Sequence, residues 1–297
     1  ESLLHKFDNL KKDGSNLLDF FHTTNIGYDG IRYALKENKI FMSNECKEYI
    51  STKLEPTKYI WYWEELQTPK GNSNVMSALD ELELELPYGK LMERILVIRN
   101  NGAYDLYKKL LWKAETSMST MKLDLGNVAI LGDASASMQV AIDTSNIIGS
   151  VLSSLCNAEL RLFNNVDKLI KTPKTASDII ETSRLHRSGG STAPAASLWP
   201  YYDQKKKVDM FIIVTDEEEN TTHNGSYSYG NSSVKGYRFA PLFKKYIEEV
   251  HQAKLIFISF TTPGLDGQMV KEMNSVIPGY GEYIKVFKLD SHRPDLT

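Results

Sequence analysis

Apolar residues in the first 114 positions recur at the spacing of an α-helix. Leu3, Phe7 and Leu10, for example, stand three or four positions apart, which places them on one face of a helix. Breaks that carry Asn, Gly or Pro interrupt the pattern at residues 25–30, 69–74 and 100–102. The pattern therefore predicts an α-helical domain over residues 1–122, built either as stacked helical hairpins or as the end of a longer helical array.

Beyond about residue 122 the chain alternates short apolar runs with helical stretches. Residues 127–132 (NVAILG) are almost wholly apolar, which is typical of a strand buried on both faces. Further strands are predicted at residues 160–163, 208–215 and 254–260, with a last edge strand at 284–287. Helices are predicted at residues 139–155, around 195–199, at 239–250 and at 266–274. This alternation predicts an α/β domain over residues 123–297, with a doubly wound, mainly parallel sheet flanked by helices.

Composition and charge narrow the classes of function. The net charge of −3 and a pI near 6.1 provide no global field that would attract nucleic acid. No apolar run approaches the roughly 18 residues that cross a bilayer, so we expect no membrane partner. Two cysteines far apart, Cys46 and Cys156, favour an intracellular, cytoplasmic protein. Three glycosylation sequons, which begin at Asn220, Asn224 and Asn231, point the other way.

Oxygen-bearing side chains cluster in three segments just past predicted strands or at a helix start. Asp133, Ser135 and Ser137 follow the strand at 127–132, and Asp216 follows the strand at 208–215. Thr192 opens a helix after two glycines. Because the carboxyl ends of parallel strands meet at one sheet edge, these side chains should converge. Carboxylates and hydroxyls are ligands that Mg²⁺ and Mn²⁺ prefer, so the five residues predict a metal site.

Two alternatives accompany the predicted metal site. The carboxylates of Asp133 and Asp216 could merely cap helix N-termini, but this leaves the paired glycines and Thr192 unexplained. Ser191, next to Thr192, could supply the hydroxyl ligand in its place.

These motifs resemble the metal-ion-dependent adhesion site (MIDAS) of von Willebrand factor A domains. That family carries Asp-x-Ser-x-Ser, then a Thr, then an Asp, and the matches here are the five residues named above, within about residues 123–290. The resemblance implies a Rossmann-like sheet and a metal-dependent protein-interaction module. Its neutral hydroxyl ligands would leave the ion enough positive charge to take an acidic group from a partner protein.

Within that family the chain resembles Ro autoantigen (TROVE-type) proteins. It shares helices before the A domain, Met138 after the Asp-x-Ser-x-Ser motif and Thr215 before Asp216. In those proteins a helical ring binds small structured RNAs and misfolded RNA ends, whereas the helical part here is too short for a complete ring. The resemblance implies RNA binding as an alternative function. The aromatic cluster at residues 59–63 (YIWYW) would then stack on bases, or it packs in the core.

Partner contacts are expected near the metal. Residues 221–236 form a long polar stretch, and loops of that length inside a compact domain are usually either functional or disordered. The candidate partner-binding residues are Glu217, His223, Tyr227 and Tyr229, with Glu217 alternatively orienting a metal-bound water. No Ser–His–Asp order, Walker loop, HExxH or CxxC occurs, and only His186 lies near the second loop in sequence. We therefore expect a binding protein and no enzyme.

Overall fold

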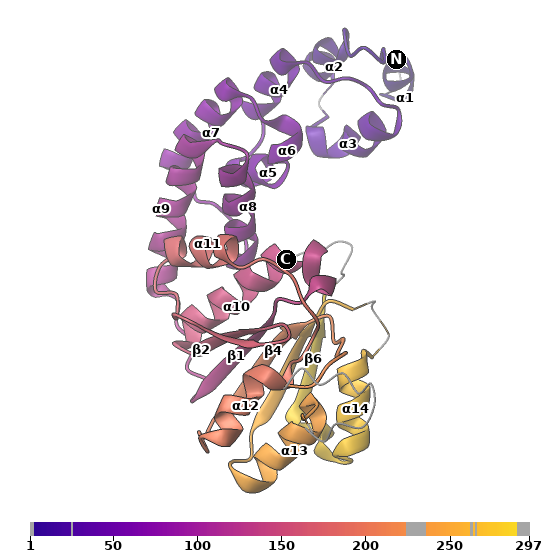
Figure 1. Ribbon diagram of the computed structural model, residues 1–297. Coiled ribbons are helices and arrows are strands. Elements are labelled where there is room, and N and C mark those ends of the chain that lie inside the picture. The colour runs from indigo at the N-terminus through magenta and orange to yellow at the C-terminus, as the bar shows by residue number, and fades with distance from the viewer. Residues whose placement is uncertain (1–2, 25, 224–235, 262–263, 265, 290–297) are drawn as a thin grey trace. The chain divides into compact units, whose positions relative to one another are not determined.

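A computed structural model describes residues 3–24, 26–223, 236–261, 264 and 266–289. The chain divides into two compact units (Figure 1). The first contains residues 1–86 and 94–110, and the second contains residues 87–93 and 111–297. The division passes through helices α8 (Tyr88–Asn100) and α9 (Tyr104–Thr120), so the predicted boundary after residue 122 stays a prediction.

The first unit is helical, as the apolar spacing predicts. Its helices before α8 are α1 (Leu3–Asp8), α2 (Leu17–Thr23), α3 (Tyr28–Glu37), α4 (Asn44–Ser51), α5 (Pro56–Trp61), α6 (Trp63–Leu66) and α7 (Pro69–Glu81). Local signals set where two of them begin. The Ser43 hydroxyl accepts a hydrogen bond from the Cys46 N–H at 3.2 Å, and Thr68 accepts one from the Gly71 N–H at 2.9 Å. Such side-chain caps satisfy N–H groups that have no partner within the helix.

The aromatic cluster at residues 59–63 contributes to the core of this helical unit. Tyr59, Ile60 and Trp63 are wholly buried. The Asn72 side-chain oxygen accepts hydrogen bonds from the Tyr59 hydroxyl at 3.1 Å and from the Trp63 indole N–H at 2.9 Å. Of the two interpretations of this cluster, the structure therefore supports core packing for these three residues.

The second unit contains one six-stranded sheet in the order β3-β2-β1-β4-β5-β6 (Figure 1). Its strands are β1 (Val128–Asp133), β2 (Glu159–Phe163), β3 (Asp167–Ile170), β4 (Met210–Thr215), β5 (Lys254–Ser259) and β6 (Ile284–Lys288). All neighbours pair in parallel except β2 and β3, which are antiparallel. The predicted α/β fold with a mainly parallel sheet is confirmed.

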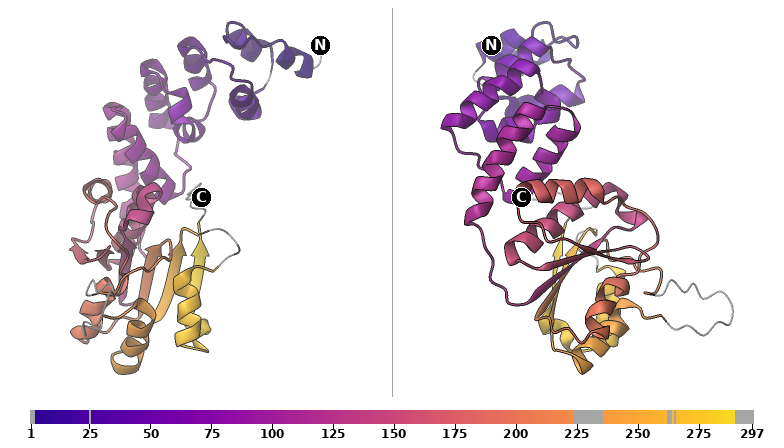
Figure 2. Two further views of the ribbon diagram at one scale, coloured as in Figure 1. Left: turned by 45° about the vertical axis from the view of Figure 1, so that its right-hand side comes forward. Right: turned by 60° about the vertical axis from the view of Figure 1, so that its left-hand side comes forward.

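Helices cover both faces of this sheet (Figure 2). One face carries α10 (Ile142–Cys156), preceded by the 3₁₀ turn η1 (Ala136–Val140), and α11 (Ala176–Leu185). The other carries α12 (Ala195–Asp203), α13 (Phe239–Glu249) and α14 (Gln268–Val276), and the 3₁₀ turn η2 (Tyr280–Tyr283) precedes β6. None of the helices in the described residues is long and apolar enough to cross a membrane.

Alternation along the central strands fills both cores. In β1, Ala129 and Leu131 belong to the core beneath α12 to α14, whereas Val128 and Ile130 belong to the core beneath α10. Successive side chains of a strand point to opposite faces, so a strand covered on both sides needs apolar residues at every position. This explains the continuous apolar runs in the sequence.

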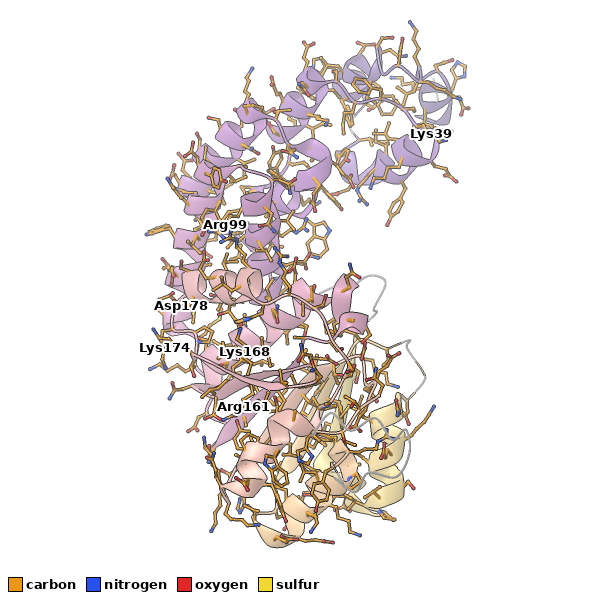
Figure 3. The ribbon with its side chains drawn as sticks, viewed as in Figure 1. Lys39, Arg99, Arg161, Lys168, Lys174 and Asp178 are labelled. Atoms are coloured by element: carbon orange, nitrogen blue, oxygen red, sulfur yellow. The ribbon has the colours of Figure 1, made fainter. Side chains whose placement is uncertain are left out.

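One strand and one α-helix of the α/β unit were absent from the sequence prediction. The edge strand β3 has four residues (DKLI) and no apolar run. It is held by pairing with β2 and by Asp167, which accepts a hydrogen bond from the Ser197 hydroxyl at 2.7 Å. The helix α11 begins with a capping box at Thr175 and Asp178, and the neighbouring Lys174 N–H also donates to Asp178 at 2.9 Å (Figure 3).

Candidate metal centre

The five predicted metal ligands lie on three loops at the carboxyl edge of the sheet. Asp133 is the last residue of β1, and Asp216 directly follows β4. Thr192 lies three residues before α12 begins at Ala195. Because β1 and β4 are neighbouring parallel strands, their last residues emerge side by side.

Backbone hydrogen bonds join the first loop to the second. The Gly189 N–H donates to the Ala134 carbonyl at 2.9 Å, and the Ala136 N–H donates to the Gly190 carbonyl at 3.1 Å. Gly190 has a left-handed backbone with φ of +79°, and a Cβ there would lie 2.7 Å from the Asn165 side-chain oxygen. The second glycine of the pair is therefore required for this close approach.

Asn220 joins the second loop to the third. Its side-chain oxygen accepts a hydrogen bond from the Thr192 N–H at 2.9 Å, and its own N–H donates to the Thr192 carbonyl at 3.1 Å. The Thr221 N–H donates to the same carbonyl at 3.2 Å. These contacts join the Thr192 backbone to the loop that carries Asp216. The sequence pointed to Asn220 only as a glycosylation sequon.

The electrostatics of this edge centre on Asp133, whose side chain is wholly buried. Its Oδ1 accepts a hydrogen bond from the Ser135 N–H at 2.9 Å, and its Oδ2 accepts one from the Thr215 hydroxyl at 2.6 Å. Burial, and then the nearby charge of Asp216, raise the pKa of Asp133 to about 7. Burial and a like charge both disfavour the ionised form. A cation beside these two carboxylates would reverse that effect.

Hydroxyl groups complete a donor set of hard oxygens. The Ser135 and Ser137 hydroxyl oxygens lie 3.0 Å apart; Ser135 is wholly buried and Ser137 is exposed. Asp216 is partly exposed, and its Oδ1 accepts a hydrogen bond from the Glu218 N–H at 3.1 Å. Within the described residues, no group of three or more His, Cys, Asp or Glu side chains could hold a metal. A site here therefore depends on serine and threonine ligands, which suit Mg²⁺ or Mn²⁺.

Thr215 connects the two acidic loops, a role that the sequence analysis did not foresee. Its hydroxyl donates to Asp133 and accepts a hydrogen bond from the Glu217 N–H at 3.0 Å. The only signal in the sequence is a hydroxyl residue at the end of an otherwise apolar strand.

Glu217 does not fit the predicted role of a partner contact. Its carboxylate is wholly buried, where it accepts hydrogen bonds from the Ser259 hydroxyl and from the Val270 N–H at 3.2 Å. Its backbone is left-handed, with φ of +63°, a conformation that costs a non-glycine residue roughly 1–2 kcal/mol. The prediction failed because a run of three glutamates gives no indication that one of them turns inward.

Glu219, two positions further on, is also buried. Its Oε1 accepts a hydrogen bond from the Phe239 N–H at the start of α13 at 2.8 Å, and Arg238 pairs with its Oε2 at 3.3 Å. Burial raises the pKa of Glu219 to about 7. The acidic run after Asp216 thus alternates, with Glu218 exposed and its two neighbours turned towards helix N-termini.

His223 lies partly buried in an aromatic stack. Its ring stacks against those of Trp199 and Tyr237, with centroid distances of 4.5 and 5.7 Å, and these two rings are 6.0 Å apart. The His223 Nδ1 accepts a hydrogen bond from the Tyr237 N–H at 2.7 Å, so that nitrogen carries no proton. Tyr227 and Tyr229 fall outside the described residues. The predicted partner-contact roles of these three residues stay predictions.

The other histidine considered for the site, His186, turns to β3. Its Nδ1 lies 3.1 Å from the Lys168 amino group, and its carbonyl accepts a hydrogen bond from the Asn146 side chain at 2.9 Å. Burial, followed by the charge of Lys168, lowers the pKa of His186. The position of Lys168 on the sheet edge is visible in Figure 3.

Comparisons with known proteins reach only the level of fold. No protein-family model matches the chain, and no curated protein matches it. The chain is similar to the Ro (RSR) protein of Deinococcus radiodurans, with a TM-score of 0.48 and 12% identity over 98% of this chain. It is also similar to a von Willebrand factor type A protein from Catenulispora acidiphila, with a TM-score of 0.33 and 14% identity over 55% of this chain.

The matched regions are parts of longer proteins, since this chain covers 61% of the Ro protein and 38% of the von Willebrand factor type A protein. The two structures are of the kinds that the sequence motifs resemble.

Proposed function

We propose that the α/β unit is a divalent-cation-dependent protein-interaction module. Asp133, Ser135, Ser137, Thr192 and Asp216 would hold Mg²⁺ or Mn²⁺, and the ion would accept an acidic group of a partner protein. The observation that carries the proposal is the buried Asp133 carboxylate, whose ionisation is opposed by burial and by Asp216. A cation offsets both effects, and the adjacent hydroxyls offer it further oxygens without adding negative charge.

The first experiment is thermal unfolding of the chain in EDTA, Mg²⁺ and Mn²⁺. An ion that binds only the native state stabilises it by about 2.7 kcal/mol at a hundredfold excess over its Kd. We expect this stabilisation in the wild type and none in Asp216→Ala. Asp203→Ala is the matched control, because Asp203 is an exposed carboxylate at the end of α12, outside the site. If neither Mg²⁺ nor Mn²⁺ raised the unfolding midpoint of the wild type, the proposal would be refuted.

The acidic-partner part of the proposal needs a separate probe. Bound Mn²⁺ should bind a short peptide that contains one glutamate. The glutamate carboxylate would displace water from the ion, and the relaxation rate of the water protons, which Mn²⁺ enhances, would then fall. The same peptide with glutamine is the control. Equal relaxation changes with the two peptides would mean that the bound ion does not select a carboxylate, and would reject the proposed binding of an acidic partner. The proposal keeps the predicted intracellular setting and assigns no catalytic step.

RNA binding by the helical unit was the alternative function, and the structure gives it no specific support. Tyr59 and Trp63, which were candidates for base stacking, are wholly buried. Lys109 of α9 forms an ion pair with Asp80. The alternative remains testable, because RNA affinity that depends on phosphate contacts falls steeply as salt is added.

A further inference from the structure

Glu217 is a strongly constrained residue near the candidate metal centre. It combines a left-handed backbone, φ of +63°, with a wholly buried carboxylate. A strained backbone and a buried charge persist only where the surroundings hold them in place. The partners of Glu217 therefore indicate what this arrangement supports.

The partners of Glu217 belong mainly to the first turn of α14. Its Oε2 accepts a hydrogen bond from the Val270 N–H at 3.2 Å, and its carbonyl accepts one from the Met269 N–H at 3.3 Å. A carboxylate in this position satisfies free N–H groups and faces the positive end of the helix dipole. Gly267 makes room for it, because a Cβ there would lie 2.4 Å from Oε2.

The same turn of α14 also holds the chain two residues later. The Gln268 side chain accepts a hydrogen bond from the Glu219 N–H at 3.2 Å and donates one to the Glu219 carbonyl at 3.1 Å. Residues 217 and 219 are therefore both attached to the start of α14.

On its other side, Glu217 is connected to the buried carboxylate of the site. Its N–H donates to the Thr215 hydroxyl at 3.0 Å, and that hydroxyl donates to Asp133 at 2.6 Å. Asp216 thus lies between Thr215, which is hydrogen-bonded to Asp133, and Glu217, which is hydrogen-bonded to α14.

We infer that Glu217 is a positioning residue of the metal centre: by anchoring the chain to the first turn of α14, it holds the Asp216 carboxylate towards Asp133. This inference rests on the proposed metal-binding function. It assigns α14 a part in the site although its own residues supply no ligand, and it predicts that cation binding and the order of the first turn of α14 depend on each other.

The test uses the full chain and Mn²⁺ alone, with free Mn²⁺ measured by electron paramagnetic resonance. Ser259→Ala removes the hydroxyl that donates to Glu217 and leaves every charge and every proposed ligand in place. We expect Mn²⁺ affinity to fall at least threefold at a temperature where the metal-free variant is fully folded. Wild-type affinity in a folded Ser259→Ala chain would overturn the inference and leave the proposed metal site intact.

A second pair of variants separates positioning from charge. Glu217→Gln and Glu218→Gln each remove one negative charge beside Asp216, but Glu218 is exposed and contacts Asp216 through its backbone N–H. We expect a loss of at least tenfold in Mn²⁺ affinity for Glu217→Gln and of at most threefold for Glu218→Gln. Equal losses would show a charge effect alone and would overturn the inference. A wild type that binds no Mn²⁺ would reject the proposed function itself.

Amide hydrogen exchange supplies a readout that a simple helix cap would not change. Mn²⁺ should slow the exchange of the Met269 and Val270 amides in the wild type. It should leave these amides unaffected in Glu217→Gln at concentrations that saturate the variant. Two outcomes would make Glu217 a cap of α14 and not a positioning residue. Mn²⁺ could slow the exchange of these amides equally in both chains, or it could bind the wild type and slow the exchange in neither chain.

Discussion

Replacing Asp133 by Asn should stabilise the metal-free protein and abolish its response to metal. The pKa of Asp133 is raised from an ordinary 3.8 to about 7, so the native state prefers the protonated side chain. Stability from this group is fully present below pH 3.8 and is lost as the pH rises through about 7. A difference of about 3 in pKa corresponds to about 4 kcal/mol, the upper limit of what removal of the charge would restore at pH 8.

The expected gain is smaller because Asn keeps only part of the hydrogen bonding. Its oxygen still accepts from the Ser135 N–H, but its NH₂ group faces the Thr215 hydroxyl, which donates to Asp133 in the wild type. A mismatched hydrogen bond costs about 1–3 kcal/mol, which leaves a gain of about 1–3 kcal/mol at pH 8. Asp203→Asn, an exposed carboxylate outside the site, should change stability by less than about 0.5 kcal/mol.

The assay is equilibrium urea unfolding in EDTA at pH 8 and pH 5, repeated at pH 8 with saturating Mg²⁺. The gain from Asp133→Asn should shrink at pH 5, where the wild-type carboxyl is already protonated, and Mg²⁺ should reverse the order of the two chains. A variant that is less stable than the wild type at pH 8 in EDTA would refute the reasoning about the buried charge. A gain of equal size at both pH values would refute it too.

Three further predictions concern other parts of the molecule. Gly267→Ala should destabilise the chain by about 1–3 kcal/mol in urea unfolding, because its Cβ would lie 2.4–2.5 Å from a buried side chain, whereas Gly281→Ala meets no atom within 4 Å; equal effects would contradict the crowding. Burial lowers the pKa of His223, so its contribution to stability is present above pH 6.5 and lost as the pH falls through its folded pKa. The protection factor of the Tyr237 amide, which compares its exchange rate with that of an unstructured peptide at the same pH, should then be smaller at pH 5 than at pH 7; an unchanged protection factor would argue against the hydrogen bond. Glu65→Gln should lower the free energy of unfolding by about 1–3 kcal/mol at pH 7. Burial raises the pKa of Glu65, but hydrogen bonds, first from Arg32, outweigh it and hold the pKa at about 2. The difference between variant and wild type in thermal unfolding should therefore shrink as the pH falls from 4.5 towards 2, and a difference that persists there would contradict its ionic origin.

Strand-end residues were the predictable part of the candidate site. The run at residues 127–132 identified β1, and the apolar run before Asp216 identified β4. Parallel strands that neighbour each other must deliver their last residues to the same edge. Periodicity therefore placed Asp133 and Asp216 at strand ends on one sheet edge, and the pairing of β1 with β4 in the structure makes them neighbours.

The supporting residues of the site were not predictable in this way. Asn220, Thr215 and Ser259 act through hydrogen bonds to residues 28, 82 and 42 positions away. Such contacts depend on how loops from different strands meet, and local spacing contains no record of that.

Local sequence by itself determined the elements whose apolar period matched their burial: the strands β1, β2, β4 and β5, and the helical class of the first unit. The break predicted at residues 69–74 was wrong, because these residues begin α7, with Pro69 in its first turn and Thr68 as its cap. Tertiary structure alone decided β3, which has only four residues and is held by its pairing with β2. It also decided that Glu217 turns inward while the chemically identical Glu218 stays exposed. The physical reason is that α14, about fifty residues later, places free N–H groups beside one of these carboxylates and not the other.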